Sequence, residues 1–210
     1  KTGLPLIISK GMADEFEVRK TLDNVCSLTD SLAVLHCVSL YPSELHHLNL
    51  RQIPRLAAMY PDVVWGFSDH SRGSLASTLA VALGARIIEK HFPLNHDLPG
   101  PDQWFSMDPG EMSDLVKDIR SCESALGTGR IEPTEEERAM FKTMRRRIVA
   151  RDDLSESTVL SLDTVAFKRS TNGAFISDWG RLAGQRLGKT KRRDEGITFD
   201  DLQTTDPEDH

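Results

Sequence analysis

Apolar and polar positions alternate in blocks along residues 1–127 and predict four strand–helix units. Each unit opens with a short apolar run rich in β-branched residues, a pattern typical of a buried parallel strand. The predicted strands cover residues 4–9, 32–39, 63–68 and 86–92. The helices that follow them are predicted over residues 14–25, 49–60, 74–83 and 108–127.

The last of these helices has a distinct start signal. Asp108 is an N-cap candidate, Pro109 follows at the first helical position, and Glu111 stands at the third. Gly84 is placed to end the alanine-rich helix before it.

Consecutive strand–helix units imply parallel pairing with right-handed crossovers, which defines an α/β fold. Two architectures accept this pattern: an open doubly wound sheet, or half of an eight-stranded barrel. Composition does not separate them. Both place ligand chemistry just past the carboxyl ends of the strands, so the residues there are the candidate site.

The pattern changes after residue 127. Gly129, Pro133 and an acidic run predict a linker over residues 128–144, with room for a short helix. Short β-like runs predict a small β-rich domain over residues 145–203. We expect the polar residues 204–210 to form a frayed tail.

Composition excludes several classes of protein. The 210 residues are 39% hydrophobic, enough for a core, but no 18-residue apolar run exists that would cross a membrane. The net charge of −6 argues against a general nucleic-acid binder. Three scattered cysteines make no metal spacing or disulfide framework, which predicts a cytoplasmic protein. The chain starts at Lys1 and enters an apolar strand almost at once, so we expect part of the protein to be missing.

Two histidines, His70 and His91, end consecutive predicted strands. Neighbouring parallel strands lie about 4.8 Å apart, so side chains at matching heights can share one ion. Two imidazoles with open positions suit a divalent transition metal that acts as a Lewis acid on a carbonyl. The alternative is that each histidine merely forms a hydrogen bond at a strand end, but the paired placement favours the metal.

Hydroxyl groups occupy three further strand ends, at Ser9, Ser39 and Ser68. Hydroxyls and free backbone N–H groups suit a phosphate or carboxylate, although serine is also common in turns. The loop at residues 99–102 ends in Asp102, whose carboxylate can accept a hydrogen bond from a sugar hydroxyl. The same loop is alternatively a simple tight turn.

Glu89 lies two residues before His91, on the same face of the predicted strand. It can therefore orient the metal or its waters. The alternative is a salt bridge to Lys90 or Arg86. His36 stands among apolar neighbours and is predicted to be a hydrogen-bonded core histidine.

Six motifs then come in a fixed order: ISKGM (8–12), HCVSLYP (36–42), GFSDH (66–70), ALGA (82–85), EKHF (89–92) and LPGPD (98–102). Together they closely resemble the sialic acid synthases, meaning N-acetylneuraminate synthases and their legionaminate and pseudaminate relatives. Residues 145–203 resemble the antifreeze-like (SAF) domain that ends those proteins.

The resemblance implies the last four units of a (β/α)₈ TIM barrel, followed by a SAF domain. It implies a transferase that condenses phosphoenolpyruvate with N-acetylmannosamine or a related aldose, giving a nonulosonic acid and phosphate. A divalent metal, most often Mn²⁺, polarises the aldehyde in such enzymes. The first half of the barrel, with the family's phosphate-binding lysines, is not in this sequence.

The resemblance also assigns roles to residues. It implies metal ligands at His70 and His91, phosphoenolpyruvate contacts at Ser9, Ser39 and Ser68, sugar contacts at Tyr41, Asp102 and Arg169, and a catalytic role for Glu89. In the family, the SAF arginine of one subunit reaches the sugar of the other, which implies a domain-swapped homodimer. No nucleic-acid or membrane partner is expected.

Two other functions fit the residues. The chain can be a non-catalytic module that binds a sugar or a partner, with the half-barrel as its scaffold. It can also be a two-histidine metal hydrolase, which needs no phosphoenolpyruvate and whose metal site usually includes a strand-end Asp.

Overall fold

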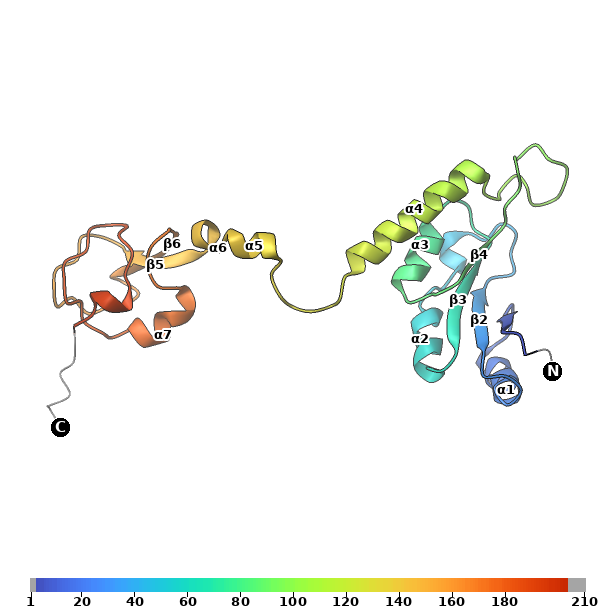
Figure 1. The fold of residues 1–210 in the computed structure, drawn as a ribbon, viewed down its shortest axis with the longest axis horizontal. Helices are drawn as coiled ribbons and strands as arrows, with labels where there is room; N and C mark the ends of the chain where they lie inside the picture. The colour runs from blue at the N-terminus through green and yellow to red at the C-terminus, as the bar shows by residue number, and fades with distance from the viewer. Residues whose placement is uncertain (1–2, 204–210) are drawn as a thin grey trace. The chain divides into compact units, whose positions relative to one another are not determined.

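The computed structural model describes residues 3–203, and the chain divides into two compact units between Gly129 and Arg130. Each unit has its own apolar core. Figure 1 shows β1 to β4 with α1 to α4 in the first unit, and the elements from α5 onward in the second. The tail predicted at residues 204–210 lies outside the described residues.

The first unit is a parallel sheet whose strands follow chain order, β1-β2-β3-β4. The strands are β1 (Leu6–Ser9), β2 (Leu32–Cys37), β3 (Val64–Asp69) and β4 (Ile88–Lys90). The helices are α1 (Glu15–Val25), α2 (Gln52–Met59), α3 (Leu75–Ala82) and α4 (Pro109–Leu126), with a short 3-10 helix η1 (Leu45–His47). The four predicted units are all present, in the predicted order.

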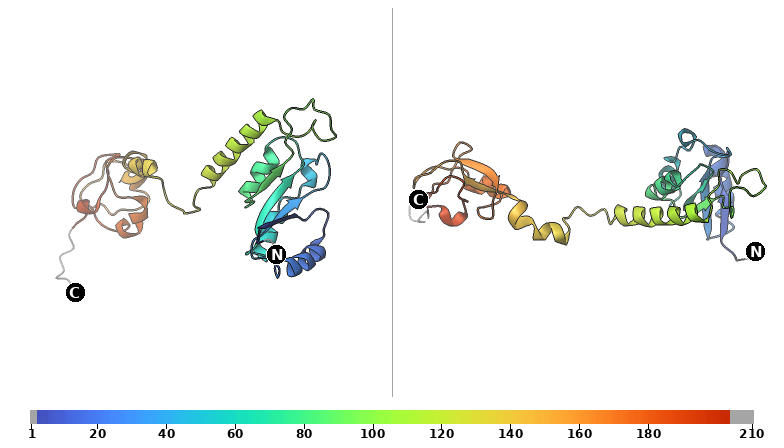
Figure 2. Two further views of the ribbon diagram at one scale, coloured as in Figure 1. Left: turned by 45° about the vertical axis from the view of Figure 1, so that its right-hand side comes forward. Right: turned by 90° about the horizontal axis from the view of Figure 1, so that it is seen from above.

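Strand order distinguishes the two architectures that the sequence left open. A doubly wound sheet reverses its strand order at a switch point, whereas this sheet runs in one direction only. Right-handed crossovers then return every helix to the same side. Figures 1 and 2 both show α3 and α4 on one side of the sheet. The unit is therefore a curled sheet with external helices, the arrangement of a partial TIM barrel.

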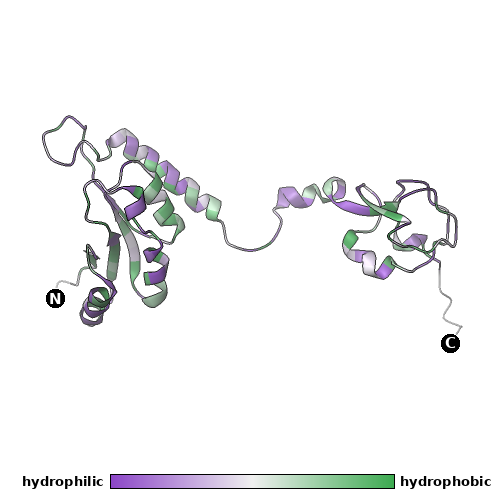
Figure 3. Cartoon of the chain, turned by 180° about the vertical axis from the view of Figure 1, so that it is seen from behind, coloured by the Kyte–Doolittle hydropathy of each residue, from purple (hydrophilic) through white to green (hydrophobic). Residues whose placement is uncertain are grey.

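The core of the first unit lies between the sheet and its helices. Val34, Trp65 and Phe67 of the sheet pack against Leu22 and Ile53 of the helices. Figure 3 accordingly colours β2 largely as hydrophobic. His36 is fully buried here, with its Nε2 2.6 Å from the Leu48 carbonyl oxygen, which confirms the predicted core histidine.

Gly66 lets two strands and their side chains approach closely. A Cβ at this position would lie 2.5 Å from Leu35 Cδ2 and 2.6 Å from the Ile87 carbonyl oxygen. A larger residue would therefore push β3 away from β2 and the segment leading into β4.

β4 is shorter than the predicted strand over residues 86–92. The His91 carbonyl accepts a hydrogen bond from the Met107 amide rather than continuing the ladder with β3. His91 consequently lies one residue past the strand, as His70 lies one residue past β3. The α4 start signal is confirmed, because Asp108 and Glu111 form a reciprocal capping box with Pro109 at the first position.

The second unit contains one small antiparallel sheet, β5 (Arg146–Ala150) with β6 (Val165–Arg169). Its helical elements are α5 (Glu135–Ala139), α6 (Phe141–Met144), α7 (Trp179–Leu182), and the 3-10 helices η2 (Ile176–Asp178) and η3 (Phe199–Asp201). The β-like run at residues 159–160 forms only an isolated bridge, between Val159 and Arg186. The predicted linker contains α5, which Figure 3 colours as largely hydrophilic.

Among residues 3–203, no helix combines the length and the apolar character needed to cross a bilayer.

Candidate active site

Register aligns a row of polar residues near the carboxyl ends of three strands. Cys37 of β2 pairs with Ser68 of β3, and Ser68 pairs with Glu89 of β4. The Ser68 hydroxyl donates a hydrogen bond to Glu89 Oε1 at 2.6 Å. Within the described chain, Glu89 makes this contact instead of the alternative salt bridge to Lys90 or Arg86.

The two imidazoles predicted to share a metal are neighbours. The ring centroids of His70 and His91 lie 5.3 Å apart, and the ring planes are nearly perpendicular at 83°. His70 is buried, whereas the side chain of His91 is 31% exposed. The pair therefore has one protected member and one open to incoming molecules.

Hydrogen bonding selects the tautomer of the neutral His70 ring. Its Nδ1 lies 2.9 Å from the Val38 carbonyl oxygen, which can only accept, so Nδ1 carries the proton. Nε2 then holds a lone pair, and it lies 3.4 Å from the Ser68 oxygen. Ser68 has a single hydrogen, which Glu89 already accepts.

The Nε2 lone pair of His70 is thus left without a proton donor among these groups. A ring nitrogen backed by a carbonyl, with the opposite lone pair unused, is the arrangement of a metal-ligating histidine. The donor set present therefore fits a divalent metal.

Tyr41 and Asp102 border the imidazoles. The Tyr41 ring stacks on His70 with centroids 4.1 Å apart, and Asp102 Oδ2 lies 3.6 Å from His91 Nδ1. Partial burial raises the pKa of Tyr41, and the nearby Cys37, Asp102 and Glu89 raise it further. The phenol therefore stays protonated in surroundings whose negative charge favours a cation.

Ser9 and Ser39 both lie near the loop that follows β1. The Ser9 hydroxyl accepts a hydrogen bond from the Gly11 amide at 3.4 Å. Ser39 Oγ lies 3.8 Å from the position a Cβ would take at Gly11, whose φ of +51° favours glycine. Burial lowers the pKa of the adjacent Lys10, while Cys37 raises it.

Arg169, the remaining predicted site residue, lies in the other compact unit. It is exposed at the end of β6 and pairs in register with Arg146 of β5. The structure therefore brings together six predicted site residues, namely His70, His91, Ser68, Glu89, Tyr41 and Asp102. It places Ser9 and Ser39 each near Gly11, and Arg169 belongs to the second compact unit.

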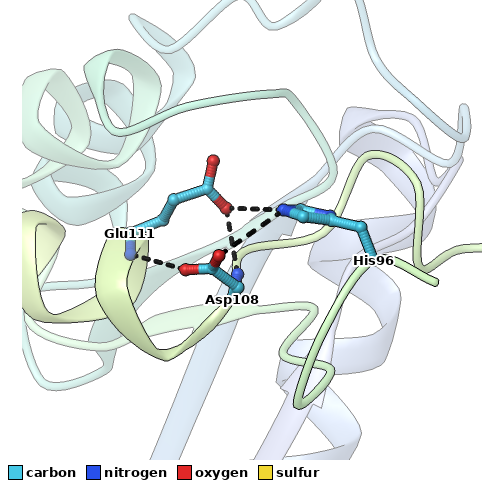
Figure 4. Close-up of side chains that lie close together, drawn as sticks. All are labelled: His96, Asp108 and Glu111. Atoms are coloured by element: carbon cyan, nitrogen blue, oxygen red, sulfur yellow. Dashed lines mark hydrogen bonds and ion pairs between the residues drawn. The ribbon is translucent and has the colours of Figure 1, made fainter. Parts of the chain in front are cut away.

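Sequence reasoning missed two groups near the site. Cys37 Sγ lies 3.9 Å from His70 Nδ1, and only the register of β2 with β3 brings it there. Figure 4 shows the second group, in which His96 Nε2 lies 3.2 Å from Glu111 Oε2 and 3.9 Å from Asp108 Oδ2. The capping motif identifies both carboxylates, but no sequence signal places His96 beside them.

The fold and the strand-end residues define a class of protein. Its members combine a parallel half-barrel, which carries polar side chains at the carboxyl edge of its sheet, with a small β domain. The NeuB family model matches residues 1–131, and the SAF domain model matches residues 145–203. The chain belongs to the NeuB family and carries a SAF domain.

Its relatives include synthases of legionaminic acid, pseudaminic acid and N-acetylneuraminate 9-phosphate. The N,N'-diacetyllegionaminic acid synthase of Legionella pneumophila is 42% identical over 189 residues, which is 88% of this chain and 53% of that protein. Human N-acetylneuraminate-9-phosphate synthase is 32% identical over 198 residues, 94% of this chain and 55% of that protein. The chain thus spans about half the length of these relatives.

A solved structure agrees with this assignment. The N-acetylneuraminic acid synthetase of Leptospira borgpetersenii, in complex with citrate, superposes with a TM-score of 0.62 at 36% identity. The match covers 67% of this chain and 49% of that protein. It supports the half-barrel architecture.

Proposed function

We propose that this chain is part of a sialic-acid-type synthase, a transferase that condenses phosphoenolpyruvate with an N-acetylated aldose such as N-acetylmannosamine. The products are a nonulosonic acid and phosphate. The observation that carries the proposal is the adjacency of His70 and His91 at the ends of neighbouring strands, with the Nε2 lone pair of His70 unused. Membership of the NeuB family supports the reaction class.

His70 and His91 would hold the divalent metal, which we propose to be Mn²⁺. When bound, the metal supplies a Lewis acid for the carbonyl of the sugar aldehyde. The Val38 carbonyl keeps His70 in the tautomer that presents Nε2. Glu89, held by the Ser68 hydroxyl, orients water beside the imidazoles.

The remaining residues bind the two substrates. Ser9 and Ser39 offer hydroxyls to phosphoenolpyruvate, and Ser68 joins them when its hydrogen turns from Glu89 to the bound substrate. The Lys10 ammonium beside Ser9 offsets the negative charge of phosphoenolpyruvate. Tyr41 and Asp102 bind sugar hydroxyls next to His91. Carbon 3 of phosphoenolpyruvate then attacks the aldehyde carbon, water adds at carbon 2, and phosphate leaves.

Arg169 completes the sugar site in this proposal. The SAF domain of one subunit offers its guanidinium to the sugar bound by the other, in a domain-swapped homodimer. We propose that the enzyme acts in the cytoplasm, where Cys26, Cys37 and Cys122 remain free thiols, as they are in this structure.

The hydrolase alternative finds less support. It calls for a strand-end Asp beside the histidines, but both oxygens of Asp69 are taken by Ser71, Ser77 and Lys90. Ser77 belongs to α3, so this carboxylate is engaged on the helix side of the sheet.

The test is phosphate release from phosphoenolpyruvate plus N-acetylmannosamine with Mn²⁺, on this chain and on a version that restores the first half of the barrel. We expect activity in the restored protein, and a loss of at least about 100-fold in His70→Ala or His91→Ala, because each removes a metal ligand. His46→Ala, which changes an exposed histidine of η1, is the matched control and should leave activity unchanged.

Activity that survives both ligand variants contradicts the proposed site. No activity in the restored protein, with sugar binding retained after deletion of residues 1–127, would instead favour the non-catalytic binding module.

A further inference from the structure

A buried ion pair lies directly behind the two imidazoles. Asp69 ends β3 and Lys90 ends β4, and the two residues pair in register. Lys90 Nζ lies 2.9 Å from Asp69 Oδ2, with side chains only 3% and 0% exposed. His70 and His91 are the next residues along their strands.

The ion pair also fixes the backbone on the far side of His70. Asp69 Oδ1 accepts hydrogen bonds from the Ser71 amide at 2.8 Å and from the Ser71 hydroxyl at 2.7 Å. Lys90 Nζ donates to the Ser71 carbonyl oxygen at 2.5 Å. Both residues that flank His70 are therefore tied to Lys90 of the neighbouring strand.

The ladder between β3 and β4 ends at the ion pair. Three residue pairs join the two strands, after backbone hydrogen bonds from Arg86 to Trp65 and from Phe67 to Ile87, and Asp69 with Lys90 is the last pair. A buried ion pair is costly to desolvate and stabilises a fold no better than apolar residues of similar size. Its directed hydrogen bonds do specify geometry, here at the point where both imidazoles leave the sheet.

We propose that Asp69 and Lys90 are positioning residues that set the spacing and orientation of His70 and His91, and through them the affinity of the site for a divalent cation. This inference rests on the metal site in the proposed function. The pair holds the strand ends from the helix side of the sheet, where Ser77 of α3 adds a hydrogen bond to Asp69 Oδ2 at 2.6 Å.

The test is Mn²⁺ binding to the full chain, measured by electron paramagnetic resonance, which reports both affinity and ligand geometry. The double variant Asp69→Asn/Lys90→Met removes both charges, so neither is left buried and unpaired. We expect Mn²⁺ affinity to fall roughly 10- to 100-fold with an altered spectrum, the usual effect of losing residues that orient metal ligands.

Ser77→Ala is the matched control. It removes a hydrogen bond to the same carboxylate but leaves the link between β3 and β4 intact, so affinity and spectrum should match the wild type. Lys90→Arg keeps the charge but places its donors on a longer, planar group, and we expect a smaller spectral change. This variant decides the question if the double variant does not fold.

The outcomes separate the two proposals. If the wild type binds Mn²⁺ and His70→Ala abolishes binding, the metal site stands. A folded double variant, or Lys90→Arg, with wild-type affinity and spectrum then overturns the positioning role alone. A wild-type chain that binds no Mn²⁺ overturns both the metal site and the positioning role.

Discussion

His36 and His70 show how similar hydrogen bonding gives two histidines different roles. Each donates one ring N–H to a backbone carbonyl, His36 to Leu48 and His70 to Val38. The second nitrogen of His36 is buried without a partner, and burial lowers the pKa of this ring. The second nitrogen of His70 instead lies 3.4 Å from Ser68, beside Glu89 and Tyr41. The direction of the free nitrogen, rather than burial, separates the core residue from the candidate ligand.

His96 is the titratable group that ties the loop carrying Asp102 to the start of α4. Its Nδ1 lies 2.9 Å from the Gln103 carbonyl oxygen, while Nε2 faces Glu111 and Asp108. The Gln103 carbonyl raises the pKa of His96, burial lowers it, and the two carboxylates raise it, so the net pKa lies above 6.5. A raised folded-state pKa means that this tie stabilises the loop below pH 6.5 and is lost as the pH rises through the folded-state value.

We therefore expect an NMR titration to place the pKa of His96 above its usual value, and Glu111→Gln to lower it. Gln preserves the helix cap but removes the charge. Asp114→Asn is the matched control, because this exposed carboxylate of α4 pairs with Lys117 and not with His96. A His96 pKa that Glu111→Gln leaves unchanged contradicts this account.

Among the elements, the sequence pattern predicts the long apolar strands. It does not predict isolated bridges between residues that are distant in sequence. β2 is an apolar run interrupted only by His36 and is buried along its whole length, so the pattern predicts it directly. The bridge between Val159 and Arg186 joins residues too distant in sequence for any local pattern to show. The candidate site residues were predictable from their place at strand ends. Their hydrogen-bond partners on neighbouring strands were not.

Lys90 is the clearest example. Its sequence neighbour Glu89 was the obvious candidate for a salt bridge, but adjacent residues of a strand face opposite sides of the sheet. Lys90 therefore bonds Asp69 of β3 on the helix-covered face of the sheet, and Glu89 bonds Ser68 of β3 on the opposite face.

In the second unit, a buried carboxylate joins η3 to the segment before it. Asp201 contacts Lys191 and Lys189, each at 2.8 Å, and its side chain is 5% exposed. Burial alone raises the pKa of Asp201, but hydrogen bonds from Lys189, Lys191 and Thr198 outweigh it and lower the pKa to about 2. The ordinary value is 3.8, so Asp201 adds stability above that pH and loses it as the pH falls towards about 2.

The expected contribution near neutral pH is about 2 kcal/mol. Asp201→Asn should cost about that much at pH 7 and leave the second unit less sensitive to acid, because the lost stability no longer titrates. Acid unfolding followed by the NMR signals of β5 and β6 checks this. Asp200→Asn, at the exposed neighbour, is the control, and an Asp201→Asn chain as acid-sensitive as the wild type contradicts the assignment.

At the scale of the whole molecule, the candidate ligands and Arg169 belong to different compact units. If the SAF domain serves the other subunit, two defective chains can repair each other. Mixing His70→Ala with Arg169→Ala in the restored protein should recover about a quarter of wild-type activity, since half of the dimers are mixed and each holds one intact site. Mixing His70→Ala with His91→Ala should recover no activity, because every barrel then carries one damaged metal site. Failure of the first mixture contradicts the swapped dimer.

The strands of the parallel sheet are buried to different extents, and this affects the free energy of substrate binding at the candidate site. All of β2 is buried, whereas in β1 Leu6 is 39% and Ile7 is 55% exposed. Local opening is easiest where few apolar contacts hold the backbone, so in this chain, which spans about half the length of its relatives, β1 opens more easily than β2. If Ser9, which ends that strand, binds phosphoenolpyruvate as proposed, the substrate must order β1 and loses affinity in proportion to that cost. In the restored protein, the first half of the barrel packs on β1 and removes this cost in advance, so we expect that protein to bind phosphoenolpyruvate more tightly than this chain does.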